Sequence, residues 1–351
     1  MKKTISLILC VILTLSMLAG CGKPQKEENE TPKVEDDGVM KVLLIGHSTG
    51  VDSAYMLPAV AKNEGMENLV VGMLYHSGCR LAQHVEYLTA NAPQYAYYEF
   101  DVASGQEEWL RADKNGNFLI CEPTAPNDIY IDDGSIGQTM QFAIARHDWD
   151  IVVMQGNCVE TANQKDGRYT PNLEADIKTI QDYVLANDIE KGTTPKFAWN
   201  MVWGMPTDRG VLRENDKTTL DTLFGGDAMN LRQGIADTAR DIIKPEENFT
   251  WFMPSAATLW QAQKMGLTVQ ELHRDYVHGT DFSRMMVSYL WYCVLFDKNI
   301  DDCTLAPVSS KLLFDALMHN TGKDLELTEE QKNVLRTCVK AAIQNPYDIC
   351  K

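Results

Sequence analysis

Ser48, Asp275 and His278 have the residue types and the spacing that a serine hydrolase needs. Ser48 follows the short apolar segment Met40–Ile45 by a tight turn, and Asp275 and His278 form an Asp-x-x-His sequence late in the chain. A serine hydroxyl becomes a nucleophile when a histidine accepts its proton. A carboxylate within one turn can hold Nδ1–H of that histidine and fix its tautomer. The sequence therefore predicts a Ser-His-Asp triad.

Two further turns could supply the donors that stabilise an oxyanion. Gly78 follows the apolar segment Leu69–Leu74 and could present a bare backbone N–H. Asn157 follows Asp150–Met154 and could add its side-chain amide, while the backbone N–H of Ser48 would face the same point. Taken alone, each turn is also explained as an ordinary strand-to-helix connection.

Apolar, β-rich segments alternate with helical patterns, which predicts an α/β fold. We expect a three-layer αβα sandwich with a central, mostly parallel five-stranded sheet. Ligands of such sheets bind at the carboxyl ends of the strands, where all four turns above would lie. The expected strands are Lys41–Ile45, Leu69–Leu74, Asp150–Met154, Pro195–Val202 and Phe249–Met253.

Between these strands, apolar residues recur at helical spacing, which predicts helices there. The apolar spacing after His278 predicts one long helix, and the capping box that starts at Thr328 predicts a final one. Tyr95–Asp133 breaks the alternation. Its Asn115-Gly116 pair is typical of a hairpin turn, so we expect a β-hairpin or a long loop there. The other expected helices are Pro58–Glu64, Ala82–Asn91, Gln138–Arg146, Asn172–Asn187 and Met229–Ile243.

Residues 1–21 resemble a bacterial lipoprotein signal peptide. Lys2 and Lys3 precede the apolar Ile5–Met17, and small residues lead to Cys21, which would carry the lipid. A transmembrane anchor is the alternative. We therefore expect export and lipid anchoring on the extracytoplasmic face of the cell membrane. Residues 22–38 would form a flexible linker, 39–298 the hydrolase domain, and 299–351 a helical extension packed on that domain.

The net charge argues against nucleic acid as a partner. It is −17 for the whole chain, and removal of the two signal lysines takes it to −19. Seven cysteines remain beyond Cys10 and Cys21; none forms a C-x-x-C pair, and their odd number leaves at least one thiol free. Without a nucleotide-binding glycine loop or metal-ligand spacing, no cofactor or metal is predicted.

The order of these motifs resembles the SGNH (GDSL-like) hydrolases, and more closely a bacterial subfamily of SGNH-like domains without an assigned substrate. The resemblance spans roughly Met40–Lys298 and includes IGHSTGVDSAYMLPAVA, LYHSGCRLAQHVEYL, WDIVVMQGN and HRDYVHGTDFSRMMVSYLWY. It implies a flavodoxin-like sheet, Ser48 as nucleophile, His278 as general base and Asp275 as its partner. The Ser48 N–H, Gly78 and Asn157 would form the oxyanion hole.

This resemblance implies an esterase or deacylase that acts on an ester-bearing small molecule or glycan, with an O-acetyl group as one candidate. Trp203 follows the strand that ends at Val202 and is expected to line the substrate cleft, with a core position as the alternative. The sequence defines no oligomeric state.

Three residues depart from the family pattern: His47, Gln155 and Cys158. They motivate a second hypothesis, a catalytically inactive SGNH-like lipoprotein that binds glycan. The Gly-x-Ser-x-Gly sequence at 46–50 also matches the nucleophile turn of α/β-hydrolases, although only one strand precedes it. A solute-binding lipoprotein is a further alternative, which would usually show two similar lobes.

Overall fold

The computed structural model describes residues 37–109, 137–162, 172–189, 194–244, 249–309, 311 and 323–350. The described residues belong to one compact unit, Asp36–Lys351. The expected signal peptide and the Asn115-Gly116 turn lie outside them. Within the described ranges, no helix has the length and apolar character needed to cross a membrane.

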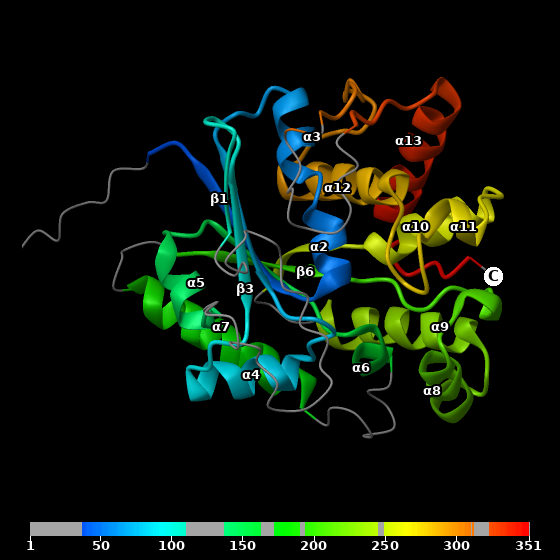
Figure 1. The fold of residues 1–351 in the computed structure, drawn as a ribbon, viewed down its shortest axis with the longest axis horizontal. Coiled ribbons are helices and arrows are strands. Elements are labelled where there is room, and N and C mark those ends of the chain that lie inside the picture. The colour runs from blue at the N-terminus through cyan, green and yellow to red at the C-terminus, as the bar shows by residue number, and fades with distance from the viewer. Residues whose placement is uncertain are drawn as a thin grey trace, which may run out of the picture. The chain divides into compact units, whose positions relative to one another are not determined.

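A seven-stranded mixed sheet forms the centre of this unit, in the order β4-β3-β2-β1-β5-β6-β7 (Figure 1). Five adjacent strands run parallel to one another: β2, β1, β5, β6 and β7. At the β2 edge, β3 pairs antiparallel with β2, and β4 pairs antiparallel with β3. The strands are β1 (Met40–Gly46), β2 (Leu69–Tyr75), β3 (Ala96–Asp101), β4 (Gln106–Trp109), β5 (Ile151–Met154), β6 (Lys196–Asn200) and β7 (Phe249–Met253).

The α/β class is confirmed, but the prediction of a five-stranded, mostly parallel sheet is wrong. The five expected segments form the parallel strands, and the hairpin of β3 and β4 adds two antiparallel strands beside β2. Tyr97, Tyr98 and Phe100 of β3 are buried, so this strand contributes to the core. The turn between the strands lies at residues 102–105, where Gly105 has a φ of +67° that favours glycine.

Helices cover both faces of the sheet (Figure 1). One layer contains α2 (Ser48–Ala54), α3 (Leu57–Asn63), α10 (Ser255–Lys264), α11 (Val269–Leu272), α12 (Asp281–Leu295) and α13 (Glu329–Gln344). The other contains α4 (Leu81–Ala90), α5 (Met140–Arg146), α6 (Cys158–Ala162), α7 (Leu173–Ile189), α8 (Glu214–Phe224) and α9 (Ala228–Thr238), which continues as the π-helix η3 (Ala239–Ile243). The short 3₁₀ helix η2 (Arg209–Val211) precedes α8.

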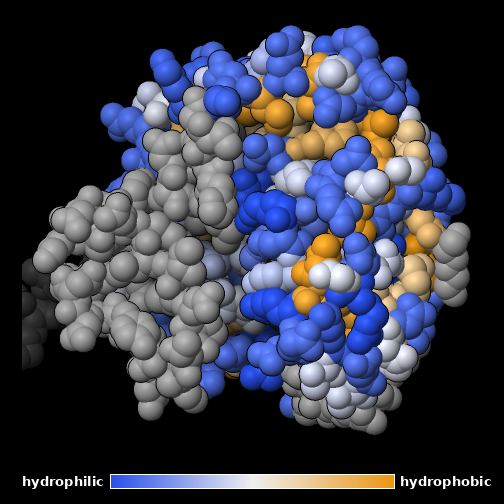
Figure 2. Space-filling model, turned by 45° about the vertical axis from the view of Figure 1, so that its right-hand side comes forward, coloured by the Kyte–Doolittle hydropathy of each residue, from blue (hydrophilic) through white to orange (hydrophobic). Residues whose placement is uncertain are grey.

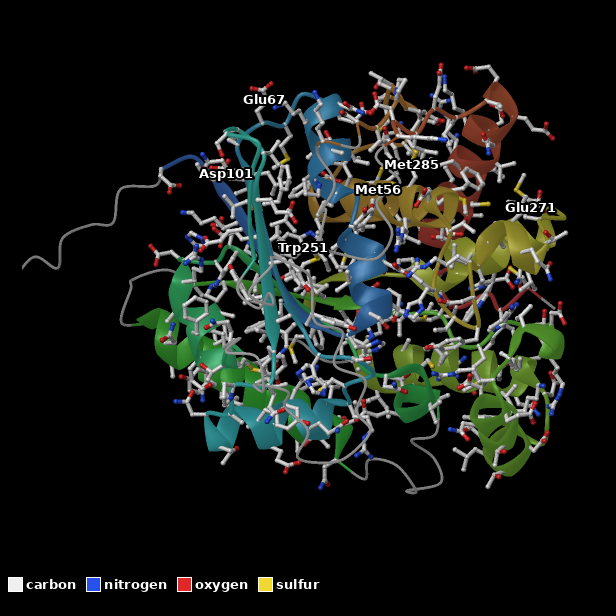
Figure 3. The ribbon with its side chains drawn as sticks, in the orientation of Figure 1. Met56, Glu67, Asp101, Trp251, Glu271 and Met285 are labelled. Atoms are coloured by element: carbon white, nitrogen blue, oxygen red, sulfur yellow. The ribbon has the colours of Figure 1, made fainter. Side chains whose placement is uncertain are left out.

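The layer that contains α12 is closely packed: all seven residues of α2 are buried, as are most residues of α12. Met285 of α12 and Met56, which precedes α3, are both fully buried, whereas Glu67 and Glu271 lie exposed at the periphery (Figure 3). The final helix, α13, packs on α10 and α12. Its predicted capping box is confirmed, with Thr328 and Gln331 bonding each other's backbone N–H groups.

The surface shown in Figure 2 is mostly hydrophilic, as the acidic composition suggests, with smaller hydrophobic patches. Among the described residues, the exposed large apolar side chains are Met265 at the end of α10 and Ile343 on α13, at 46 % and 44 % exposure. Single exposed apolar side chains of this kind are normal for a soluble surface.

A buried polar network holds α2 against the sheet. The Gln155 amide donates to the His47 carbonyl (3.4 Å), and its oxygen accepts from Asn200 at the end of β6 (3.1 Å). Asn200 also contacts the hydroxyls of Ser53 on α2 (3.3 Å) and Ser255 on α10 (2.6 Å). All these side chains are buried, so their hydrogen bonds replace those that water would make. The network therefore fixes the helix that begins at Ser48.

Gly50→Ala should destabilise the protein, although alanine is the better helix former by about 1 kcal/mol. A Cβ at position 50 would lie 2.0 Å from Gln155 Oε1 and 2.5 Å from its Cδ, so the buried amide must move. We expect a net loss of roughly 1–3 kcal/mol in the free energy of unfolding, measured by urea denaturation. Gln155→Ala in the same chain should relieve part of this loss. A more stable Gly50→Ala protein would contradict the packing argument.

Candidate active site

The carboxyl ends of three adjacent strands bring the predicted site segments together. β1 lies between β2 and β5, with Gly46 paired to Tyr75 and Ile45 to Met154. The turns after these strands therefore emerge side by side. They carry Ser48 after β1, Gly78 after β2 and Asn157 after β5. This edge of the sheet is where ligands bind in open α/β folds.

Ser48 is the first residue of α2. His47 before it has extended backbone (φ −128°, ψ −170°), so the chain passes from strand to helix within one residue. Ser48 is 9 % exposed, and no partner among the described residues hydrogen-bonds its hydroxyl. Its backbone N–H belongs to the first helical turn, where N–H groups have no partner within the helix.

Asp275 and His278 form the hydrogen-bonded pair that their three-residue spacing predicts. Asp275 Oδ2 lies 2.8 Å from His278 Nδ1, and Oδ1 accepts from the backbone N–H groups of Val277 (2.9 Å) and His278 (2.8 Å). Burial acts to raise the pKa of Asp275, but these hydrogen bonds hold it well below its ordinary value. His278 Nε2 is buried without a hydrogen-bond partner among the described residues. The imidazole is therefore oriented by one nitrogen and available at the other.

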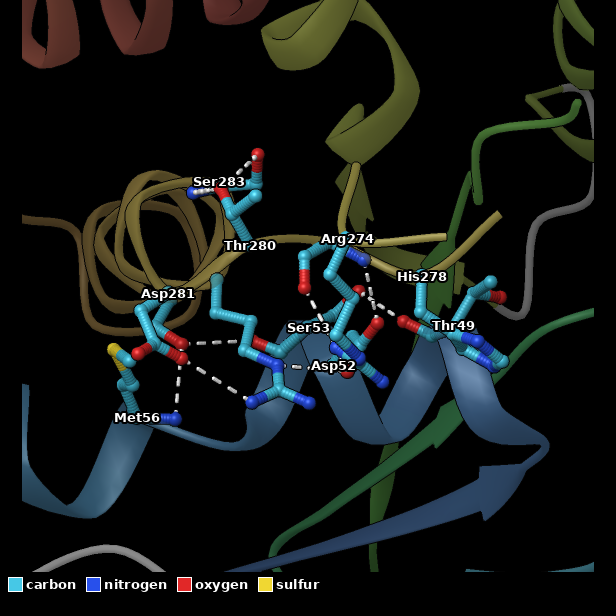
Figure 4. Close-up of polar contacts among 12 residues, drawn as sticks. Thr49, Asp52, Ser53, Met56, Arg274, His278, Thr280, Asp281 and Ser283 are labelled. Atoms are coloured by element: carbon cyan, nitrogen blue, oxygen red, sulfur yellow. Dashed lines mark hydrogen bonds and ion pairs between the residues drawn. The ribbon is translucent and has the colours of Figure 1, made fainter. Parts of the chain in front are cut away.

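A buried ion pair connects the His278 loop to α2. Asp52 lies one turn after Ser48, is fully buried, and accepts from Gly279 N (2.8 Å), Arg284 Nε (2.9 Å) and Arg274 (3.3 Å) (Figure 4). Burial acts to raise the pKa of Asp52, but Arg284 and then Arg274 hold it below its ordinary value.

Sequence reasoning missed this clasp of Asp52, Arg274, Arg284 and Gly279. Nothing in the spacing of Asp52 pairs it with residues so distant along the chain. An aspartate one turn after the serine, in a helical segment without another charged residue, is the one signal in the sequence that could have indicated it.

Gly78 and Asn157 lie in direct contact. Asn157 Nδ2 donates to the Gly78 carbonyl (3.2 Å), and Asn157 Oδ1 accepts from Val159 N (2.9 Å), which fixes the orientation of the amide. Gly78 has a φ of +60°, and a Cβ there would meet no atom within 4 Å. Its backbone conformation, rather than crowding, is therefore the reason for glycine.

His47 has a role in joining segments rather than in accepting a proton from Ser48. Its Nε2 lies 3.3 Å from the Gly156 carbonyl, which requires a proton on that nitrogen, and Nδ1 lies 3.4 Å from the Thr49 hydroxyl. Burial lowers the pKa of His47 to about 4. His47 therefore connects the Ser48 turn to the Asn157 turn as a neutral side chain.

Trp203 does not have the exposed position expected of a residue that lines a cleft. It is 1 % exposed, and its indole N–H donates to the Val277 carbonyl (2.6 Å). His273 Nδ1 lies 3.2 Å from the same carbonyl. Both side chains therefore support the loop of Asp275 and His278 from the interior.

Cys79 and Cys158 directly follow Gly78 and Asn157 but are free, buried thiols. Burial raises the pKa of Cys158 to about 12 and that of Cys79 well above its ordinary value. Both are therefore protonated near neutral pH, and neither is a ready nucleophile.

Comparison with known proteins adds a likeness of fold. No family model matches the chain, and no curated protein matches it. Among solved structures, the chain is similar to a DUF4886 family protein from Bacteroides uniformis, with a TM-score of 0.64 and 17 % sequence identity over 89 % of this chain and 97 % of that chain. At this identity the likeness concerns the fold alone.

Asp52→Asn should destabilise the protein strongly. The change removes the carboxylate that compensates the charges of Arg274 and Arg284. The Arg284 side chain is only 1 % exposed, so its charge would remain buried without that carboxylate. Loss of one partner from a buried ion pair costs about 3–5 kcal/mol. Urea denaturation measures this change. Asp281→Asn is the matched control, because Asp281 contacts the same Arg284 (3.4 Å) from a side chain that is 42 % exposed. Equal losses in the free energy of unfolding for the two substitutions would contradict a stabilising role for the buried ion pair of Asp52.

Stability should fall as the pH falls from about 6.5 toward 4. Burial lowers the pKa of His47 to about 4 and that of His84 to about 3, whereas both titrate near 6.5 when unfolded. The unfolded chain therefore binds more protons than the folded chain in this pH window. The contribution of the two neutral histidines to the free energy of unfolding is fully present above about pH 6.5 and is lost as the pH falls toward 4. At 1.36 kcal/mol per pKa unit, His47 alone accounts for roughly 3 kcal/mol by pH 4.

Urea denaturation between pH 7 and 4.5 measures this dependence. The carboxylates of Asp52 and Asp275 have lowered pKa values, so they titrate below the window. His47→Gln should flatten the dependence, and an unchanged slope would contradict the assignment of a neutral, buried His47.

Proposed function

We propose that the chain is a serine esterase or deacylase of the SGNH type, with Ser48 as nucleophile, His278 as general base and Asp275 as the group that orients it. One observation carries the proposal. His278 is hydrogen-bonded to Asp275 through Nδ1, and its buried Nε2 has no hydrogen-bond partner in the part of the chain that the structure describes. It lies on a loop that is bonded to the helix beginning at Ser48.

In the proposed reaction, Ser48 Oγ attacks the carbonyl carbon of an ester while His278 Nε2 accepts its proton. The N–H groups of Ser48 and Gly78 and the Asn157 amide stabilise the negative oxygen of the tetrahedral intermediate. The intermediate collapses, and His278 returns the proton to the departing alcohol. Water then attacks the acyl-enzyme with His278 again as base, which releases the acid and restores Ser48.

Two of the departures from the family pattern, Gln155 and Cys158, are compatible with this proposal. Gln155 is fully buried, and its amide is used in the network beneath α2. Cys158 is a buried, protonated thiol at the start of α6. Neither side chain provides a charge or a nucleophile that competes with Ser48.

We further propose that the enzyme acts outside the cytoplasm, anchored through a lipid on Cys21, on an acylated small molecule or glycan. An O-acetyl group on a glycan is the preferred substrate. This part of the proposal comes from the signal-like sequence of residues 1–21 and from the resemblance to SGNH hydrolases.

An inactive glycan-binding module is the second candidate. The observation in its favour is that no hydrogen bond joins Ser48 to His278 among the described residues. Catalytic hydrogen bonds are often long without substrate and shorten in the reacting complex, so we prefer the enzyme.

A fluorophosphonate probe and p-nitrophenyl acetate distinguish the two candidates. The wild-type protein should be labelled and should release p-nitrophenol. Ser48→Ala should abolish labelling, and Ser48→Ala and His278→Ala should each lower kcat by roughly 10³-fold or more.

Ser104→Ala, at an exposed serine in the turn between β3 and β4, is the control and should retain both signals. A folded wild-type protein that is neither labelled nor active, yet binds glycan, would favour the binding module.

A further inference from the structure

Glu160 is a fully buried carboxylate that the proposed reaction does not use. It lies on α6, immediately beyond the Asn157 turn. Its Oε2 accepts from Leu81 N (3.0 Å) and from Asn157 N (3.2 Å), and its Oε1 also lies within hydrogen-bond distance of Leu81 N (3.1 Å). One carboxylate therefore holds two backbone N–H groups that are far apart in sequence.

These two N–H groups belong to the two turns that would form the oxyanion hole. Leu81 begins α4, three residues after Gly78, and the Asn157 N–H belongs to the proposed side-chain donor itself. The Asn157 amide makes the second link between the turns, at 3.2 Å from the Gly78 carbonyl. Two connections between the same turns limit both their separation and their relative rotation.

The neighbourhood of Glu160 is suited to a buried anion. The N-terminal end of a helix such as α4 carries a partial positive charge and N–H groups without intrahelical partners. Gly156 lies against the carboxylate, since a Cβ there would be 2.6 Å from Thr161 Cγ2 and 3.3 Å from Glu160 Oε2. The glycine of the Gln155-Gly156-Asn157 turn therefore makes room for α6 and its carboxylate.

We propose that Glu160 is the positioning residue of the oxyanion hole, which holds Gly78 and Asn157 at the separation that a tetrahedral intermediate requires. This inference rests on the proposed esterase function. Glu160 acts through the two turns and contacts no substrate. Because oxyanion donors act on the transition state, a defect in their placement should lower kcat and leave KM nearly unchanged.

Two conservative variants test this role in the full chain with p-nitrophenyl acetate. Glu160→Asp keeps the charge but is one methylene too short to reach both turns, so kcat should fall roughly 10- to 100-fold at an unchanged KM. Glu160→Gln keeps the length, and its oxygen at the place of Oε2 can accept from both N–H groups, but its NH2 group then faces the Leu81 N–H, 3.1 Å from the place of Oε1. It should lose less kcat than Glu160→Asp, because both turns remain within reach. The rate of fluorophosphonate labelling should follow the same order.

Glu64→Asp is the matched control, because Glu64 also accepts from backbone N–H groups, those of Thr304 and Leu305, between α3 and a distant loop. A wild-type kcat in Glu160→Asp, a rise in KM in place of a fall in kcat, or an equal loss in Glu64→Asp would overturn the inference. A wild-type protein that is neither labelled nor active would instead overturn the esterase function, and with it the role of Glu160.

Discussion

The interaction of Asp52 with Arg274 of the His278 loop and with Arg284 of α12 is the constraint on which the candidate site depends. Asp52 is fully buried one turn after Ser48, and Arg274 and Gly279 flank His278 closely in sequence. A buried carboxylate is costly unless charges and hydrogen bonds compensate it, so the loop cannot leave α2 without removing the Arg274 and Gly279 contacts from Asp52. The arrangement of Ser48 and His278 is therefore tied to the stability of the fold.

Around this clasp, other buried polar groups fix each segment of the site. Gln155 and Asn200 hold α2 to the sheet, and Trp203 donates to the Val277 carbonyl from the interior. Glu160 joins the turns that carry Gly78 and Asn157. Such preorganisation is what catalysis by fixed dipoles requires, because the donors need not move when charge develops. The same bonds explain why polar residues occupy so much of the interior beneath the site.

The fold could be predicted from the sequence wherever local patterns decide it. The parallel strands and the capping box at Thr328 follow from apolar runs and from capping chemistry that act within a few residues. A hairpin within Tyr95–Asp133 was one of two expectations, but its addition to the sheet could not be predicted, because β3 pairs with the distant β2 and β4 pairs with β3. The turn with Gly105 also has a weaker signal than Asn115-Gly116. The sequence left Trp203 open between the cleft and the core; its burial favours the core, and burial depends on what packs around a side chain.

The sequence by itself determined the chemistry that is available: an Asp-x-x-His turn whose spacing brings Asp275 Oδ2 to 2.8 Å from His278 Nδ1, and a serine, a glycine and an asparagine that each follow a strand. Only the tertiary structure decided how these turns are held together. Asp52 with Arg284, and Glu160 with Leu81, are pairs separated by long stretches of chain. Local propensity carries no information on such contacts, because they exist only once the sheet has brought its strand ends side by side.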